Sequence, residues 1–418
     1  MGFTTYNLIR SKIFYSLISI MKISYLTFGC KLNQAETDSL RRELESLGYS
    51  TVKFGTDEEI CIIRACGVTC NASYTTREHI RRAKKQGAYV VVAGCVENKN
   101  LAEIDFVGQT NELIKEHLLE NFDPQIKNTN TENVVTDKTR AFVKIQTGCN
   151  FQCAYCIIPS FRGKSISIDK DKIIKELKLL EAGGYNEVIL TGVNICSYKN
   201  NNLNLAGLLK EILQTTSIPR FRLGSLDPRL IDKKLINIYK NPRLMPHWHL
   251  SLQSGSDEVL HLMHRRYTTK QYSAIVEKMR ALYPNFSFTT DIIVGFPGET
   301  EKNFQETLNF IKKIKFTKIH VFPFSPRPGT LAEKMKPQIQ DKIKTERVKK
   351  LCLEAKHTAQ TFITRFFNQN KEVLFEQKKS GYFFGYTPEY LRIKLKSAKN
   401  LHNKIIATKI TARNTITE

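Results

Sequence analysis

Three cysteines lie within eight residues of one another near the middle of the chain, at Cys149, Cys153 and Cys156. Zinc sites usually have four ligands built from C-x-x-C pairs, whereas no histidine or fourth cysteine follows closely here. Three thiolates on a [4Fe–4S] cluster leave one iron open to an outside ligand. An open iron suits a reacting cofactor, so the spacing favours a catalytic iron–sulfur cluster over zinc or buried thiols.

A second set of three cysteines is spread through the first hundred residues, at Cys30, Cys66 and Cys95. Each falls at or within two residues of the end of an expected β-strand. Parallel strands bring their carboxyl ends to one edge of a sheet, where α/β proteins bind ligands. Three converging thiolates predict a second cluster with one open iron, although buried cysteine is also common in protein cores.

Most of the other cysteines are expected to be structural. Cys352 lies on the apolar stripe of an expected helix, and Cys61 lies within an expected strand. Cys70 comes four residues after Cys66 and could compete for the second cluster. Cys196 follows a strand end, where it could approach the active site or simply pack beside it.

Small and polar residues at further strand ends are candidates for binding a cofactor or substrate. A cofactor would pass Gly192 and Asn194, and Gln253, Ser254 and Asp291 could bind ribose or substrate. A tight turn that needs glycine explains Gly192 equally well. These five positions therefore stay open between ligand binding and local structure.

The first-domain cysteines belong to a region expected to fold over residues 21–125, after an N-terminal extension of residues 1–20. Short apolar runs alternate there with amphipathic stretches, which indicates crossover connections and a parallel sheet. A linker rich in Asn and Thr follows at residues 126–139. The expected strands are 23–28, 60–65 and 89–93, and the expected helices are 34–47 and 74–85.

The Cys149 motif belongs to a central domain, residues 140–369, built from repeated strand–helix units. Six such units predict a partial (βα)6 barrel of parallel strands with its active site at their carboxyl ends. Residues 370–418 change to short alternating strands rich in Lys and Arg, which predicts a small antiparallel β module. The fold class is therefore α/β. The expected central strands are 142–146, 187–192, 220–225, 247–252, 286–295 and 317–324.

Charge and composition constrain what the chain binds. Lys and Arg number 64 against 40 Asp and Glu, a formal net charge of +24, which favours association with polyanions such as nucleic acids. The ten cysteines are unevenly spaced in a long chain, a usage typical of metal-bound thiolates in a reducing, cytoplasmic compartment. The apolar run at residues 13–20 is far shorter than the ~20 residues of a membrane span, so no membrane partner is expected.

Together these features resemble the radical S-adenosylmethionine methylthiotransferase family, and most of all its tRNA N6-threonylcarbamoyladenosine subgroup. The resemblance covers nearly everything from Met21 to about Lys350. The tail is similar, less distinctly, to the small RNA-binding TRAM barrel. Besides the cysteines, the motifs that carry the resemblance are Gly29-Cys30-Lys31-Leu32-Asn33-Gln34, Lys144-Ile145-Gln146, Ile157-Ile158-Pro159 with Arg162-Gly163, Leu190-Thr191-Gly192-Val193-Asn194, Leu252-Gln253-Ser254-Gly255-Ser256, Arg265-Arg266-Tyr267, Asp291-Ile292-Ile293-Val294-Gly295-Phe296-Pro297-Gly298-Glu299-Thr300 and Phe324-Ser325-Pro326-Arg327-Pro328-Gly329-Thr330.

The resemblance implies two [4Fe–4S] clusters and S-adenosyl-L-methionine as cofactors. By it, the central cysteine set holds the radical-generating cluster, and the first-domain set holds an auxiliary cluster that carries the sulfur. The implied reaction adds a methylthio group at C2 of N6-threonylcarbamoyladenosine, the nucleoside 3′ of the anticodon. The implied partners are the tRNA anticodon loop and an electron donor such as flavodoxin or ferredoxin, and the enzyme itself is expected to be a monomer.

Radical chemistry suits this reaction because an aromatic C2–H bond is too inert for a side-chain base. No essential histidine is therefore expected, and His247, His249 and His320 are interpreted as core or surface residues. Two interpretations of the tail aromatics, such as Tyr382 and Tyr390, stay open: they stack on unpaired RNA bases, or they form the hydrophobic core of a small barrel.

Other functions stay open on the sequence alone. The same core could act on isopentenyladenosine in tRNA or on a ribosomal-protein aspartate. A protein of another class would be a catalytically silent iron–sulfur module that only binds RNA, but such a module has no use for an open iron. Two departures from the family pattern bear on the clusters and substrate: Arg64-Ala65 precede Cys66 where the family usually has Asn-Thr, and Ile168 stands where it tends to have Arg.

Overall fold

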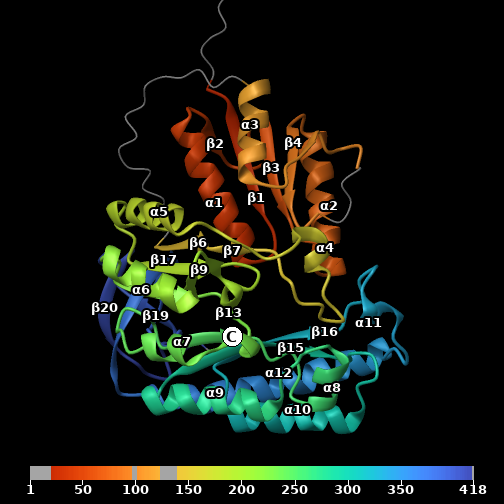
Figure 1. Ribbon diagram of the computed structural model, residues 1–418. Helices are drawn as coiled ribbons and strands as arrows, with labels where there is room; N and C mark the ends of the chain where they lie inside the picture. Colours follow the sequence, from red (N-terminus) through yellow and green to blue (C-terminus); the bar gives the residue numbers. More distant parts are fainter. Residues whose placement is uncertain (1–19, 97–100, 123–138, 417–418) are drawn as a thin grey trace, which may run out of the picture.

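The computed structural model describes residues 20–96, 101–122 and 139–416, arranged as three packed parts (Figure 1). An N-terminal α/β domain lies at the top of the view, a central α/β domain lies below it, and a C-terminal β module packs beside the central strands. Within the described ranges, no helix is long and apolar enough to cross a membrane. The expected extension and linker fall almost wholly outside the described residues.

The N-terminal domain is a parallel sheet of five strands in the order β2-β1-β3-β4-β5, with helices on both faces. Its central strand β3 is buried along its whole length, as a continuous apolar run requires. Helices α1 and α3 bury Leu44 and Leu118 on one face, and α2 buries Ile80 on the other. The elements are β1 (Lys22–Thr27), α1 (Lys31–Ser46), β2 (Ser50–Val52), β3 (Ile60–Ala65), α2 (Cys70–Lys85), β4 (Tyr89–Gly94), β5 (Phe106–Val107) and α3 (Asn111–Asn121).

The central domain holds two parallel sheets, ordered β12-β9-β6 and β13-β14-β15-β16. A parallel bridge between Phe221 and Leu244 lies beside their junction, and one large apolar core joins both sheets to the surrounding helices. The strands are β6 (Arg140–Lys144), β7 (Gln146–Thr147), β8 (Ile166–Ser167), β9 (Glu187–Thr191), β10 (Lys199–Asn200), β11 (Leu203–Asn204), β12 (Arg220–Leu223), β13 (Ser225–Leu226), β14 (His247–Leu250), β15 (Ser287–Val294) and β16 (Lys318–Pro323). The helices are α4 (Ile158–Arg162), α5 (Lys170–Ala182), α6 (Leu205–Thr215), α7 (Lys233–Ile238), α8 (Asp257–Leu262), α9 (Thr269–Leu282), α10 (Glu301–Ile314), α11 (Leu331–Lys334) and α12 (Asp341–Ile363).

The C-terminal module is an antiparallel sheet in the order β20-β17-β18-β19-β21. It covers the amino-terminal ends of the central strands: Arg222 of β12 donates to the carbonyl oxygens of Thr387 and Pro388, and Arg140 of β6 pairs with Glu376. The central active-site end therefore stays on the opposite side, toward the N-terminal domain. The strands are β17 (Asn370–Lys379), β18 (Tyr382–Tyr386), β19 (Arg392–Lys396), β20 (Lys404–Lys409) and β21 (Thr415–Ile416).

Candidate active site

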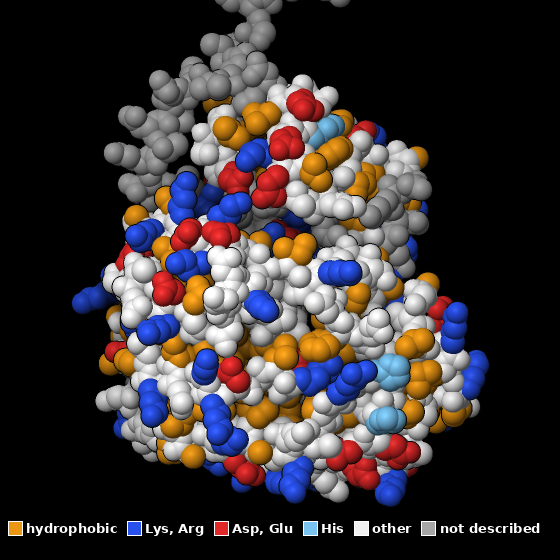
Figure 2. All heavy atoms as spheres, in the orientation of Figure 1, with side chains coloured by type: hydrophobic (Ala, Val, Ile, Leu, Met, Phe, Trp, Pro, Cys, Tyr) orange, Lys and Arg blue, Asp and Glu red, His pale blue; other side chains and the backbone are white. Residues whose placement is uncertain are grey.

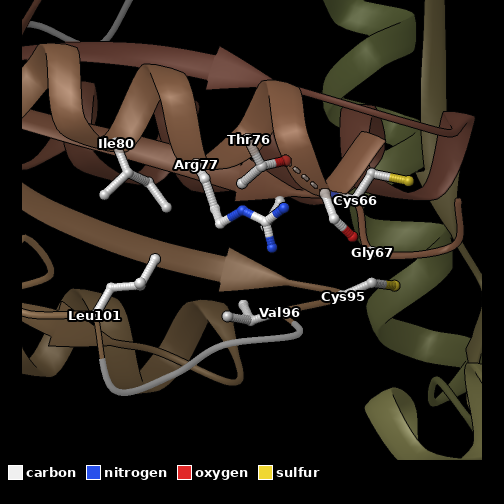
Figure 3. Close-up of a pocket in the computed structure, with 10 residues that line it drawn as sticks. Cys66, Gly67, Thr76, Arg77, Ile80, Cys95, Val96 and Leu101 are labelled. Carbon is white, nitrogen blue, oxygen red and sulfur yellow. Dashed lines mark hydrogen bonds between the residues drawn. The ribbon is translucent and has the colours of Figure 1, made fainter. Parts of the chain in front are cut away.

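The first-domain cysteines follow three adjacent parallel strands. Cys30 lies between β1 and α1, Cys66 follows β3 and Cys95 follows β4. The loops approach so closely that a Cβ on Gly29 would meet Sγ of Cys66 at 2.8 Å, and one on Gly67 would meet the carbonyl oxygen of Cys95 at 2.8 Å. Figure 3 shows the side chains of Cys66 and Cys95 directed to the same side, away from the pocket behind them. The three thiols therefore gather at one sheet edge.

Burial favours the protonated thiol at two of these positions, Cys66 and Cys95. Burial raises the pKa of Cys95 to about 11, although the Arg162 guanidinium opposes the shift. Burial also raises the pKa of Cys66, and the neighbouring Cys30 adds to that rise. A bound iron–sulfur cluster supplies the positive charge that deprotonates such thiols. A closely spaced, partly buried set of three thiols fits a [4Fe–4S] cluster with one open iron.

The central cysteines lie on the loop between β7 and α4, which is fixed at several points. Backbone N–H groups of Cys149 and Ala154 donate to Gly163 and Met263 over 3.1 and 3.0 Å. Gly148 has a φ of +70°, and a Cβ there would lie 2.0 Å from the carbonyl oxygen of Lys164. Burial raises the pKa of Cys156 to about 12, so this thiol, like Cys95, needs a metal centre to be held as a thiolate.

Charged residues that the sequence analysis did not assign surround this loop. Arg265 lies 3.8 Å from Sγ of Cys153 and 3.2 Å from Oδ2 of Asp227. Arg229 also bonds Asp227 and lies 3.5 Å from the centre of the Phe151 ring. Asp227 directly follows β13. Because ligands bind at the carboxyl ends of parallel strands, this position could have identified Asp227 in the sequence as a candidate site residue.

Two of the five open candidates lie beside the central loop. The side chain of Asn194 hydrogen-bonds Cys149, which opposes the rise that burial causes in the pKa of that thiol. Its Oδ1 is buried with no hydrogen-bond partner among the described residues, as expected of an atom that binds a ligand. Gly192 instead packs against Gln146, since a Cβ there would lie 2.6 Å from the Gln146 carbonyl oxygen. Close approach explains this glycine without a ligand.

The other three candidates have different surroundings. Gln253 adopts a φ of +71°, and its backbone pairs with that of Asp291 over 2.9 Å. Ser254 is fully buried and its hydroxyl contacts Thr307, so the structure does not bring it to the site. The carboxylate of Asp291 lies 3.2 Å from Nε2 of His249.

The sequence analysis interpreted these histidines as core or surface residues; in the structure His247 and His249 are buried, and two of the three lie beside Asp291. The side chains of His249, Asp291 and His320 offer nitrogen and oxygen atoms within 4.8 Å of one another. These residues stand side by side because β15 pairs with β14 and β16, with Asp291 directly opposite His320. His247, His249 and His320 line one cavity, and the buried His247 also stacks on Tyr390 at 4.5 Å between ring centres.

Arg162 of α4 connects the two cysteine sets. Its Nε donates to Sγ of Cys95 over 3.3 Å, and its Nη2 donates to Oδ1 of Asn33 over 2.6 Å. Its Nη1 lies 3.0 Å from the carboxylate of Glu36. Burial alone would raise the pKa of Glu36, but Arg162 and Lys144 lower it to about 2. The N-terminal and central domains therefore meet through a buried ion network.

Arg64, one of the departures from the family pattern, joins this network. Its Nη1 lies 3.7 Å from Glu36, and it hydrogen-bonds Asn111 of α3. The sequence analysis did not identify Glu36. Cys70 lies apart from these contacts, with Sγ 3.4 Å from Oγ of Ser325 and 3.5 Å from Nη1 of Arg327.

Two family models match the chain. The model described as the Radical SAM superfamily matches residues 143–311, which contain the Cys149 motif. The model described as Uncharacterized protein family UPF0004 matches residues 22–114, which contain Cys30, Cys66 and Cys95.

Similar proteins cover nearly the whole chain. The threonylcarbamoyladenosine tRNA methylthiotransferase MtaB of Aquifex aeolicus is 38% identical over 84% of this chain and 91% of its own length. The MtaB of Bacillus subtilis is 33% identical over 93% of each chain. The tRNA-2-methylthio-N(6)-dimethylallyladenosine synthase of Thermodesulfovibrio yellowstonii is 32% identical over 86% of this chain and 89% of its own.

Among solved structures, the radical S-adenosylmethionine methyltransferase TsrM of Kitasatospora setae, with cobalamin and a [4Fe–4S] cluster bound, is similar in fold. The TM-score is 0.55 at 15% identity, over 75% of this chain and 77% of that one. The expected α/β class with parallel sheets is confirmed. The chain belongs to the radical S-adenosylmethionine methylthiotransferase family, whose cofactors are S-adenosylmethionine and two [4Fe–4S] clusters.

Proposed function

We propose that this chain adds a methylthio group at C2 of N6-threonylcarbamoyladenosine, 3′ of the anticodon in tRNA. The observation that carries the proposal is the meeting of both cysteine sets at one domain boundary, where Arg162 bonds Cys95. The names of the Aquifex aeolicus and Bacillus subtilis relatives support this substrate. A reaction that combines radical generation with sulfur transfer needs both centres near one substrate.

In this proposal the two cysteine sets hold the two clusters. When bound, the clusters and S-adenosylmethionine supply the radical chemistry and the sulfur that an inert aromatic C–H bond requires. Asn194 binds the cofactor through its otherwise unpartnered Oδ1. Arg265 and Asp227 fix the environment of Cys153, and Arg162 holds the domains in one arrangement.

The C-terminal module offers the charge for binding RNA. In this TRAM-like module Phe383 is buried in the core, whereas Tyr382 is exposed. Figure 2 shows Lys and Arg side chains spread over the face below the N-terminal domain. We propose the tRNA anticodon loop as partner, flavodoxin or ferredoxin as electron donor, a monomeric state and the cytoplasm as location. The exposed lysines of the module are Lys378, Lys379, Lys396, Lys399, Lys404 and Lys409.

A reconstituted reaction tests the substrate. Protein with both clusters is incubated anaerobically with S-adenosylmethionine, dithionite and an anticodon stem-loop that carries threonylcarbamoyladenosine, isopentenyladenosine or unmodified adenosine. The proposal predicts methylthiolation of the first RNA alone. Methylthiolation of the isopentenyl RNA alone would move the chain to the subgroup of the Thermodesulfovibrio yellowstonii relative, and 5′-deoxyadenosine without RNA product would point to a ribosomal protein.

A further inference from the structure

A cavity of about 200 Å³ lies where all three parts of the chain meet. A single water needs only ~10–15 Å³ by the same measure, so the cavity has room for an organic group. Lys31 comes from the N-terminal domain, His249 and His320 come from the central strands, and Tyr390 and Arg392 come from the C-terminal module.

The lining is cationic. Lys31 contributes positive charge, as do Lys318 and Arg392, which already take part in other interactions. The described residues that line the cavity include no Asp or Glu. The nearby carboxylate of Asp291 is already engaged by His249 at 3.2 Å. An anionic group is therefore the ligand that this lining would stabilise.

Lys31 links the cavity to the first cysteine set. It directly follows Cys30 in the sequence and begins α1. Its Nζ lies 5.8 Å from the centre of the Tyr390 ring. Within the part of the chain that the structure describes, the side chain of Lys31 makes no ion pair or hydrogen bond. The ammonium group is thus available to a ligand beside the first cysteine set.

The opposite wall of the cavity is held rigidly. Tyr390 has a φ of +68°, a left-handed conformation that is costly for a bulky residue and persists only where the surroundings enforce it. Its ring stacks between His247 and Tyr386, at 4.5 and 4.6 Å between ring centres. Burial alone would raise the pKa of Tyr390, but Lys31 and Arg140 help to lower it. The Tyr390 wall of the cavity is therefore held in place beside the positive charges of Lys31 and Arg140 before a ligand binds.

We propose that this cavity receives the N6-threonylcarbamoyl group of the substrate, with Lys31 binding its carboxylate and His320 hydrogen-bonding its polar atoms. The inference rests on the proposed function and adds the residues that read the modification. An isopentenyl group has no charge, so it would leave the Lys31 ammonium without an anionic partner. A divalent cation on His249, Asp291 and His320 is disfavoured because Lys31 acts electrostatically on Asp291.

The test compares binding of two RNAs to the protein with both clusters. One stem-loop carries threonylcarbamoyladenosine, and the other carries its primary carboxamide, which has nearly the same shape without the charge. Fluorescence anisotropy should give a Kd for the acid that is lower than the Kd for the amide by about tenfold or more. One charge-assisted hydrogen bond provides a difference of this size. Lys31→Met should raise the Kd of the acid by a similar factor and leave the Kd of the amide within about twofold.

Two further variants distinguish an effect of the Lys31 charge on binding from damage to the neighbouring Cys30. Lys31→Arg should retain the preference for the acid, and Lys178→Met, on the exposed face of α5, should bind both RNAs as the wild type does. Iron content confirms that each variant holds its clusters. The inference would be overturned by equal affinity of the wild type for acid and amide, by an intact preference in Lys31→Met, or by a stoichiometric metal other than iron that His320→Asn removes.

The reconstituted reaction, run beside these binding measurements, distinguishes the inference from the proposed function. The proposed function fails if the wild type cleaves S-adenosylmethionine without methylthiolating the threonylcarbamoyl RNA, whatever the two Kd values are. The inference fails alone if that RNA is methylthiolated and the acid and amide bind equally.

Discussion

The Nε atom of Arg162 donates a hydrogen bond to Sγ of Cys95 over 3.3 Å. Arg162 ends α4, six residues after Cys156, whereas Cys95 directly follows β4 of the N-terminal domain. A residue fixed by the loop of one cysteine set therefore contacts a thiol of the other. The arrangement of the domains and the environment of the auxiliary cluster depend on the same side chain.

Replacing Arg162 should change the potential of the auxiliary cluster. A cationic N–H donor at a ligand sulfur favours the more negative, reduced cluster. Arg162→Gln should lower the midpoint potential on the order of 60 mV, one tenfold change in a one-electron equilibrium. The measurement is a redox titration followed by electron paramagnetic resonance, in protein whose Cys149, Cys153 and Cys156 are replaced by Ala. Arg162→Lys keeps the charge and should shift less; an unchanged potential in Arg162→Gln would show that the contact does not tune the cluster.

Gly192→Ala should weaken use of S-adenosylmethionine through crowding. The added Cβ would lie 2.6 Å from the carbonyl oxygen of Gln146, and the Gln146 amide donates to Thr147 and Gly148 at the start of the cysteine loop. Overpacking of this kind costs about 1–3 kcal/mol, so the rate of 5′-deoxyadenosine formation should fall about tenfold. Gly183→Ala is the matched control, because its Cβ would come no nearer than 3.4 Å to another atom. Equal rates in both variants would contradict the steric explanation.

Glu36→Gln should destabilise the protein in a pH-dependent way. The folded pKa of Glu36 is about 2 against an ordinary value of 4.5, which corresponds to about 3 kcal/mol of stability. Because the folded pKa is depressed, this stability is present above about pH 4.5 and is lost as the pH falls toward 2. Urea unfolding of the wild type and the variant at pH 7, 5, 4 and 3 measures it.

Acid releases the clusters from both proteins alike, so the informative quantity is the difference between their free energies of unfolding. That difference should shrink below pH 4.5. Glu120→Gln, at an exposed position of α3, should show almost none at any pH. If the difference between wild type and Glu36→Gln stays constant from pH 7 to 3, the Glu36 ion network does not stabilise the fold.

The two cysteine sets should separate two activities. Cys153→Ala should abolish 5′-deoxyadenosine formation, because the open iron that binds S-adenosylmethionine is lost. Cys66→Ala should retain that formation and lose transfer of the methylthio group. Cys352→Ala, on α12, should keep both. Chromatography of the nucleoside products measures both activities, and loss of 5′-deoxyadenosine in Cys66→Ala would contradict the division of roles.

Elements with strong local signals were predictable from the sequence. The apolar run of β3 was predicted with the bounds that the structure has, Ile60–Ala65. Helix α1 begins at Lys31, three residues before the predicted start, because no side chain caps its amino end and the sequence therefore gives no start signal. The sequence analysis missed β2 and β5, which have three and two residues, too few for a periodic pattern.

Contacts between distant segments were not predictable in the same way. Glu36 and Arg162 are 126 residues apart, and neither position shows by itself that a buried ion pair forms. The grouping of Asp291 with His320 depends on strand register between β15 and β16, which tertiary packing decides. Periodicity reports which face of a strand is buried, but it does not report which polar side chains meet across a sheet.

The most direct test of the central claim is mass spectrometry of tRNA nucleosides from cells with and without this gene. Cells that lack it should lose 2-methylthio-N6-threonylcarbamoyladenosine and accumulate the precursor without the methylthio group. Wild-type protein should restore the nucleoside, and the Cys153→Ala variant should not. An unchanged level of that nucleoside, with loss of its isopentenyl counterpart or of neither, would contradict the account.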